Sequence, residues 1–284
     1  MRNRQQNNNL KEPRDKTLGF FTYGILKPGQ IAYSKIRDEI EEKIECVINY
    51  SMLHRDGVPI LTNSQRDYIK TKGYIYYFKD NKRAYEIICE SFSNKLYRWG
   101  TIEIDGEEVN VLFGFKPIHG SEHIESDIDR ESFDGRRDPL FKEGLELIRE
   151  NLESEHYSWE KGFFKLQMNY MLLWSAIDRF SRLRYNKEKE HENRIEMSKE
   201  KTFRDALEKY ANREHRLVFN TEQLFPNKFD IDNPRNCINY YYTLRCNIVH
   251  RGKSSMRDID MLEQATRELL DIFEYMLDDA FREE

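Results

Sequence analysis

The chain lacks several features that would place it in a familiar class of protein. No apolar run approaches the roughly 18–20 residues that a membrane-spanning helix needs, and residues 1–9 contain no apolar segment of a secretory signal. No two of its four cysteines stand at C-x-x-C spacing, which argues against a zinc site or a disulfide framework. We therefore expect a cytoplasmic protein that does not associate with membranes.

Length and composition favour a soluble chain with two domains. The chain has 284 residues, which is more than one average domain. Charged residues make up 34% of it and hydrophobic residues 38%, enough to build two modest cores. Because the net charge is −5, any binding of nucleic acid must come from a local basic patch.

The first half of the chain is rich in residues that favour β-strands. Alternating apolar residues and turn residues predict strands at Leu18–Tyr23, Gly73–Phe78, Tyr97–Ile104 and Glu108–Phe115. The last two strands flank Asp105-Gly106, a dipeptide typical of a tight hairpin turn. Apolar residues at helical spacing predict two helices, at Ala32–Tyr50 and Lys82–Cys89.

The second half is predicted to be helical throughout. Residues 117–138 are polar and aperiodic, so we expect a linker between a domain at 17–116 and another at 139–284, with a disordered tail at 1–16. Helical patterns cover Phe141–Leu152, Trp159–Arg184, Thr202–Ala211, Cys237–His250 and Met256–Phe281. The charged run 186–201 is typical of a solvated helix or a mobile loop. The fold class is therefore α+β.

A turn follows the first predicted strand and carries a candidate binding motif, Tyr23-Gly24-Ile25-Leu26. Backbone N–H groups exposed after such a turn can hold an anion such as a carboxylate. Further along, Glu90 lies among apolar residues just before Tyr97. A carboxylate acts as a general base when partial burial raises its pKa, and Glu90 is a candidate for that role.

These pieces, with Gly57-Val58-Pro59 and the strand at Gly73, resemble the gamma-glutamylcyclotransferase-like family over residues 17–116. The resemblance implies a mixed, β-barrel-like cyclotransferase fold. It implies that the turn amides bind the α-carboxylate of a gamma-glutamyl ligand, that Glu90 moves a proton, and that 5-oxoproline is released. Ile25 and Ser91 depart from the family pattern, so the fold could also be kept with another ligand or with none.

The most informative stretch lies near the C-terminus and contains Arg245, His250 and Arg251. On a helix, Arg245 and His250 are about one and a half turns apart. A guanidinium group matches the geometry of a phosphate, and histidine exchanges protons near neutral pH. Together they could cleave a phosphodiester bond without a metal ion or another cofactor. The alternative is an ordinary histidine of a packed helix.

This Arg-x4-His motif, paired with the earlier helix Leu173-Trp174-Ser175-Ala176-Ile177-Asp178, resembles the HEPN superfamily over residues 140–284. The resemblance implies an all-α helical bundle and a symmetric homodimer in which two copies of the motif meet. It implies that His250 handles protons, that Arg245 stabilises charge on the phosphate, and that Asp178 supports a basic group. Asn247 and Arg251, beside the motif, are candidate RNA contacts.

Three functions follow from these patterns. The first is a HEPN-type endoribonuclease regulated by a cyclotransferase-like sensor, a combination that suits host defence or a toxin system. The second is a gamma-glutamylcyclotransferase that uses Glu90, with the helical domain serving dimerisation. In the third neither site is active and the protein only binds its partners.

Overall fold

The computed structural model describes residues 10–55, 58–66, 69–115, 138–154, 156–158, 161–185, 187, 189–219, 225–251 and 258–283, with the backbone alone at 54, 55, 58, 250, 251 and 258. The chain forms two compact units. The N-terminal unit comprises residues 1–138, 183–186 and 280–284, and the C-terminal unit comprises residues 139–182 and 187–279.

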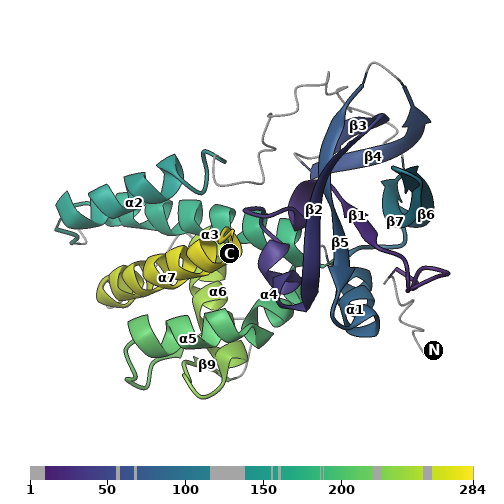
Figure 1. The fold of residues 1–284 in the computed structure, drawn as a ribbon. Coiled ribbons are helices and arrows are strands. Elements are labelled where there is room, and N and C mark those ends of the chain that lie inside the picture. Colours follow the sequence, from purple (N-terminus) through teal and green to yellow (C-terminus); the bar gives the residue numbers. More distant parts are fainter. Residues whose placement is uncertain are drawn as a thin grey trace, which may run out of the picture. The chain divides into compact units, whose positions relative to one another are not determined.

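A five-stranded mixed sheet forms the framework of the N-terminal unit (Figure 1). Its strands, in spatial order, are β2 (Ile40–Ile48), β5 (Thr71–Phe78), β1 (Phe20–Thr22), β7 (Glu107–Gly114) and β6 (Tyr97–Ile104). β1 runs antiparallel to β5 and parallel to β7. In the described part of the chain β2 and β6 do not pair with each other, so the sheet is open and the predicted barrel-like closure is not observed.

Each face of this sheet is covered by a different element. Helix α1 (Asn81–Ser91) packs on one face through Tyr85, whose ring contacts the edges of Phe78 and Trp99. The separate hairpin of β3 (Tyr50–Arg55) and β4 (Val58–Gln65) contributes Leu61 to the core on the other face. That core contains Phe21, Ile75, Ile102, Val109, Val111 and Phe113.

The predicted hairpin is confirmed and one predicted helix is wrong. β6 and β7 pair through the turn at Asp105 and Gly106, whose φ angles of 52° and 86° suit a tight hairpin. Helix Ala32–Tyr50 does not exist: two short 3-10 turns, Tyr33–Lys35 and Arg37–Glu39, lead into β2. Pairing with β5 along the whole of β2 outweighs the helical spacing of its isoleucines.

Residues 10–16, which lie in the predicted tail, are held on the sheet. Leu10 is buried and its N–H donates to Phe92 O at 3.2 Å. The indole of Trp99 donates to Lys11 O, and the amide of Asn110 donates to Asp15 O, both at 2.6 Å. Residues 1–9 and most of the predicted linker lie outside the described residues.

The C-terminal unit is helical. It contains α2 (Glu143–Ser154), α3 (Phe163–Tyr185, whose last residues count with the other unit), α4 (Glu190–Lys199), α5 (Lys201–Tyr210), α6 (Pro234–Arg251), α7 (Asp258–Ala280) and the small strands β8 (Leu217–Val218) and β9 (Asn227–Lys228). The α+β prediction, with the sheet first and the helices after it, is confirmed. Among the described residues no helix is long and apolar enough to cross a membrane.

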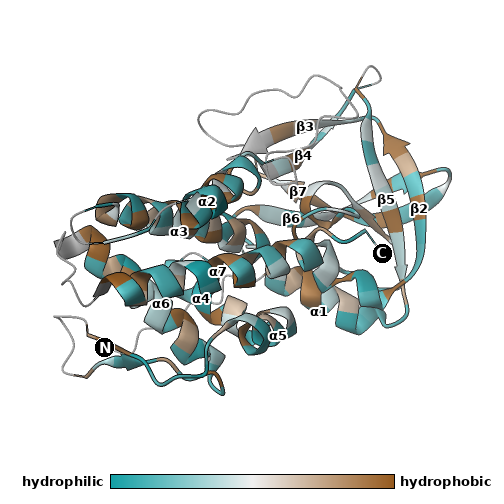
Figure 2. Ribbon diagram, turned by 90° about the vertical axis from the view of Figure 1, so that its left-hand side faces the viewer, coloured by the Kyte–Doolittle hydropathy of each residue, from teal (hydrophilic) through white to brown (hydrophobic). Residues whose placement is uncertain are grey.

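Aromatic side chains from α3, α6 and α7 fill the core of this unit. Trp174, Tyr170, Tyr241 and Phe273 are at most 1% exposed. Figure 2 shows hydrophobic and hydrophilic residues on the same helices, as amphipathic helices require. Phe164, near the start of α3, lies outside this core and is 73% exposed.

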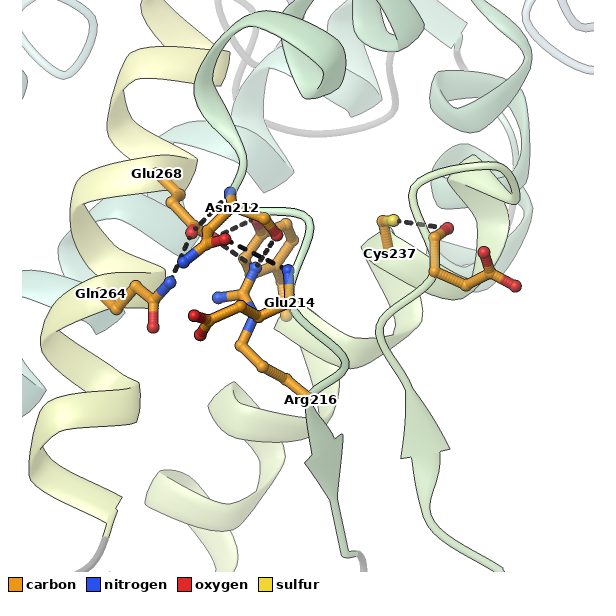
Figure 3. A network of polar contacts seen from close by, with 8 residues as sticks. Asn212, Glu214, Arg216, Cys237, Gln264 and Glu268 are labelled. Carbon is orange, nitrogen blue, oxygen red and sulfur yellow. Dashed lines mark hydrogen bonds and ion pairs between the residues drawn. The ribbon is translucent and has the colours of Figure 1, made fainter.

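A buried polar network joins α7 to α6 and to the segment after α5 (Figure 3). The guanidinium of Arg216 lies 2.8 Å from the Glu268 carboxylate, and both side chains are less than 10% exposed. Glu268 also accepts from Tyr241 Oη, Gln264 Nε2 and the backbone N–H of Asn212, at 2.9–3.0 Å. This carboxylate therefore ties three segments together.

Candidate functional site

Helix α6 carries the Arg-x4-His motif. Asn233 precedes the helix, and its side-chain oxygen accepts a hydrogen bond from the backbone N–H of Asn236. Pro234 is the first residue of the helix, a position that tolerates proline. Arg245 is half-buried, and its Nε has no hydrogen-bond partner among the described residues. His250 and Arg251 lie in the last turn of α6, and their side chains are outside the described residues.

Two carboxyl groups lie beside Arg245. Asp178 of α3 and Glu190 of α4 share a hydrogen bond. Burial, and next the negative charge of Glu190, raise the pKa of Asp178 to about 7, although Arg245 and Arg194 act to lower it. The pair therefore holds a proton near neutral pH, in the electrostatic field of two arginines.

A second arginine, Arg194 of α4, completes the cluster. It is 8% exposed, and its guanidinium carbon lies 3.4 Å from the centroid of the Tyr242 ring. Its Nε and Nη1 have no hydrogen-bond partner in the described part of the chain. The guanidinium carbon of Arg245 lies 5.7 Å from the same ring, and Trp174 packs edge-on against it. Tyr242 thus serves as a platform for both cations.

The cluster combines two cations with guanidinium N–H groups that have no partner in the described part of the chain. Buried polar groups are nearly always hydrogen-bonded, so guanidinium N–H groups without a partner need an explanation. A guanidinium group is also the side chain best matched to the geometry of an oxyanion such as phosphate. We refer to Asp178, Glu190, Arg194, Tyr242 and Arg245 as the arginine cluster.

Asn247 has a structural contact rather than a place in the arginine cluster. Its amide donates to Phe219 O at 3.0 Å, which holds the segment after β8 against α6. The structure therefore brings together Arg245 and Asp178 of the predicted residues and adds Arg194 and Glu190. Those two lie in the mixed-charge run 186–201, where no sequence signal distinguished them from solvated residues.

The N-terminal turn has the predicted shape but little space. Gly24 has a φ of 72°, and a Cβ there would lie 2.5 Å from Pro59 Cγ. Leu26 O accepts from Tyr76 Oη, and Tyr23 Oη donates to Leu112 O. The cavity beside the turn, of about 10 Å³, has room for about one water molecule. Its walls are largely apolar and include Tyr23, Ile25, Leu26, Pro59, Phe92 and Tyr97.

Glu90 does not line this cavity. It lies on the exposed side of α1, whereas its neighbours Cys89 and Ser91 are buried. The partial burial expected of a general base is therefore not observed at Glu90. Of the Gly57-Val58-Pro59 piece, Gly57 lies outside the described residues, and Pro59 packs against Gly24.

Comparison with known proteins gives little further guidance. No family model matches the chain, and no curated protein matches it. Among solved structures, the uncharacterized protein PH0828 from Pyrococcus horikoshii is similar to part of it, at 19% sequence identity and a TM-score of 0.32. The match covers 39% of this chain and 90% of that one. The described residues contain no group of three or more histidine, cysteine or acidic side chains placed to hold a metal ion.

Proposed function

We propose that the C-terminal unit is an endoribonuclease of the HEPN type, which cuts RNA by attack of a 2′-hydroxyl on the adjacent phosphate. The observation that carries the proposal is the arginine cluster. Arg194 and Arg245 flank one tyrosine ring, and both have buried N–H donors that lack a partner in the described part of the chain. The positive charge of two neighbouring guanidinium groups suits the phosphates of an RNA backbone.

Each residue then has a distinct role. Arg245 and Arg194 bind the scissile phosphate and stabilise the charge that grows on it during attack. His250, about one and a half turns beyond Arg245, moves the proton of the 2′-hydroxyl or of the leaving oxygen. The negative charge that remains on the Asp178–Glu190 pair positions the two guanidinium groups, since both arginines act to lower the pKa of Asp178.

A second copy of the chain would complete the site. Phe164 and Met168 are four residues apart on α3, and they are 73% and 70% exposed. Large apolar side chains that share one exposed helix face are typical of an interface. We propose that α3 contributes to a homodimer in which two copies of the motif act together.

The N-terminal unit, in this proposal, regulates rather than catalyses. The cavity at the 23–26 turn is too small for a gamma-glutamyl compound, and Glu90 is exposed elsewhere on α1. We expect no 5-oxoproline from gamma-glutamyl amines incubated with the protein. Release of 5-oxoproline that is lost in Glu90→Gln would instead support the cyclotransferase function.

The decisive test is cleavage of single-stranded RNA in the presence of EDTA. We expect products that end in a 2′,3′-cyclic phosphate, and resistance of a substrate with a single 2′-deoxy residue at the cut site. His250→Ala should lower the cleavage rate by roughly 10²–10⁴-fold while RNA is still bound. Arg245→Ala and Arg194→Ala should each lower it by roughly 10²–10³-fold and also weaken binding.

Arg204→Ala is the matched control. Arg204 lies on the exposed side of α5 in the same unit, so its replacement removes one charge without touching the arginine cluster. Its cleavage rate should equal that of the wild type. A strict requirement for Mg²⁺, or cleavage of single-stranded DNA, would refute the proposed chemistry even if nuclease activity were present.

A further inference from the structure

A second cavity in the N-terminal unit, separate from the 23–26 turn, has the properties of a ligand site. It has a volume of about 310 Å³, at the lower end of the range for small-molecule sites. It lies between the β3–β4 hairpin and the ends of β6 and β7. Its lining residues are Ser51, Leu53, Thr62, Asn63, Ser64, Arg66, Arg98, Gly114 and Phe115.

An irregularity in the β3–β4 pairing creates one wall of this cavity. Tyr50 pairs with Gln65, but Met52, two residues on, pairs with Leu61. Three residues of β4, Thr62–Ser64, therefore stand opposite the single residue Ser51. Bulges of this kind redirect side chains and often lie beside functional sites. Here all four of these residues line the cavity.

Ser51 supplies an independent sign of a missing ligand. Its side chain is 2% exposed, and its hydroxyl has no hydrogen-bond partner among the described residues. The backbone carbonyl of the same residue is satisfied, since it accepts from Thr62 Oγ1 at 2.9 Å. A buried hydroxyl without a partner costs free energy, and its residue, Ser51, is among those that line the cavity.

The charge of the lining residues defines the ligand. Arg66 and Arg98 bring two positive charges, and no acidic residue is among the described residues that line the cavity. The guanidinium carbon of Arg98 lies 5.6 Å from the centroid of the Phe115 ring, so a cation and an aromatic surface stand side by side. Hydroxyl and amide groups from Ser51 and Asn63–Ser64 add hydrogen-bonding capacity.

The geometry points to a binding site for a small organic anion, in which the arginines hold a carboxylate or a phosphate, Ser51 donates to it, and Phe115 contacts an apolar part. Gly114 also lines the cavity, and a side chain is not tolerated there because an added Cβ would lie 2.8 Å from Ile60 Cβ. The site is independent of the nuclease proposal, and its test needs no RNA.

Titration calorimetry of the full chain with three probes tests this site. Phenyl phosphate and phenylacetate share an aromatic ring and differ in their anion, whereas inorganic phosphate lacks the ring. We expect one of the two aromatic probes to bind more tightly than inorganic phosphate. Which of the two binds shows whether the site takes a phosphate or a carboxylate. Arg98→Gln should weaken that binding about tenfold or more, as expected for one charge-assisted contact.

Two further variants make the test specific. Ser51→Ala should weaken binding and yet leave the melting temperature of the ligand-free protein unchanged or higher, because it removes an unpartnered hydroxyl. Arg83→Gln removes an exposed charge of α1 in the same unit and should bind like the wild type. Failure of both aromatic probes to bind at millimolar concentration overturns the proposal. So does undiminished affinity in Ser51→Ala, or an equal loss in Arg83→Gln.

Discussion

Removal of the Glu268 carboxylate should destabilise the C-terminal unit more than any exposed charge change. The carboxylate accepts from four donors, one of them the buried Arg216 guanidinium. Glu268→Ala would leave that positive charge without its counter-charge in a buried site. Breaking a buried ion pair in this way typically costs about 3–5 kcal/mol. In a unit of this size the loss corresponds to a fall in melting temperature of roughly 10 °C.

The surroundings of Arg216 explain why the loss is not easily repaired. Its Nε and Nη1 already lack partners in the described part of the chain, and its guanidinium carbon lies 4.1 Å from the centroid of the Phe229 ring. Water cannot reach the guanidinium without displacing this packing. Tyr241, whose hydroxyl donates to Glu268, belongs to α6, so the variant should also loosen the helix that carries the arginine cluster.

Thermal unfolding followed by far-ultraviolet circular dichroism measures this effect, because the C-terminal unit is almost entirely helical. Glu263→Gln is the matched control on the same helix. Glu263 pairs with Arg267 four residues later, at 2.7 Å on a partly exposed surface, and such pairs contribute about 0.5 kcal/mol or less. Equal melting temperatures for Glu268→Ala and Glu263→Gln would refute the reasoning.

Three further predictions concern other parts of the chain. The pKa of Asp178, raised to about 7 from an ordinary value of 3.8, gives the folded state extra stability that is complete below about pH 4 and is lost as the pH rises through 7. The free energy of unfolding, measured with urea, should therefore fall between about pH 4 and 7 by at most about 1.4 kcal/mol per pH unit. In Asp178→Asn this dependence on pH should be weaker. Gly73→Ala places a Cβ 2.4 Å from Thr22 O, so it should destabilise the sheet by about 1–3 kcal/mol, whereas Gly144→Ala in α2, whose nearest neighbour is 3.5 Å away, should not. Phe164→Glu should shift light scattering from dimer to monomer with unchanged helix content, and a wild type that is already monomeric would argue against a composite nuclease site.

Local signals in the sequence were sufficient for much of the fold. The Asp105-Gly106 dipeptide fixed the β6–β7 hairpin because few other residues adopt positive φ angles at both positions. Long apolar periodicity predicted α3, α6 and α7 to within a few residues of their observed ends. These elements depend on neighbours along the chain, which a sequence displays directly.

Elements that depend on distant partners were not predictable in the same way. β2 has isoleucines at helical spacing, and only its pairing with β5 makes it a strand. Arg194 and Glu190 acquire their place beside Arg245 through the packing of α4 on α6, which a mixed-charge run does not reveal. The cavity at Ser51 arises from a pairing register, and no residue type announces that register.

The position of β2 at the border of the sheet bears on how the protein avoids self-association. A border strand offers unpaired N–H and C=O groups to any other extended chain, and Ile44 and Val47 of β2 are 41% and 46% exposed. The strand carries Glu41, Glu42 and Lys43 before Ile44, and Glu45 between the two apolar residues. Two such strands from different molecules would bring carboxylates together. Replacing these glutamates with uncharged residues should therefore cause the protein to form sheet-like aggregates at high concentration.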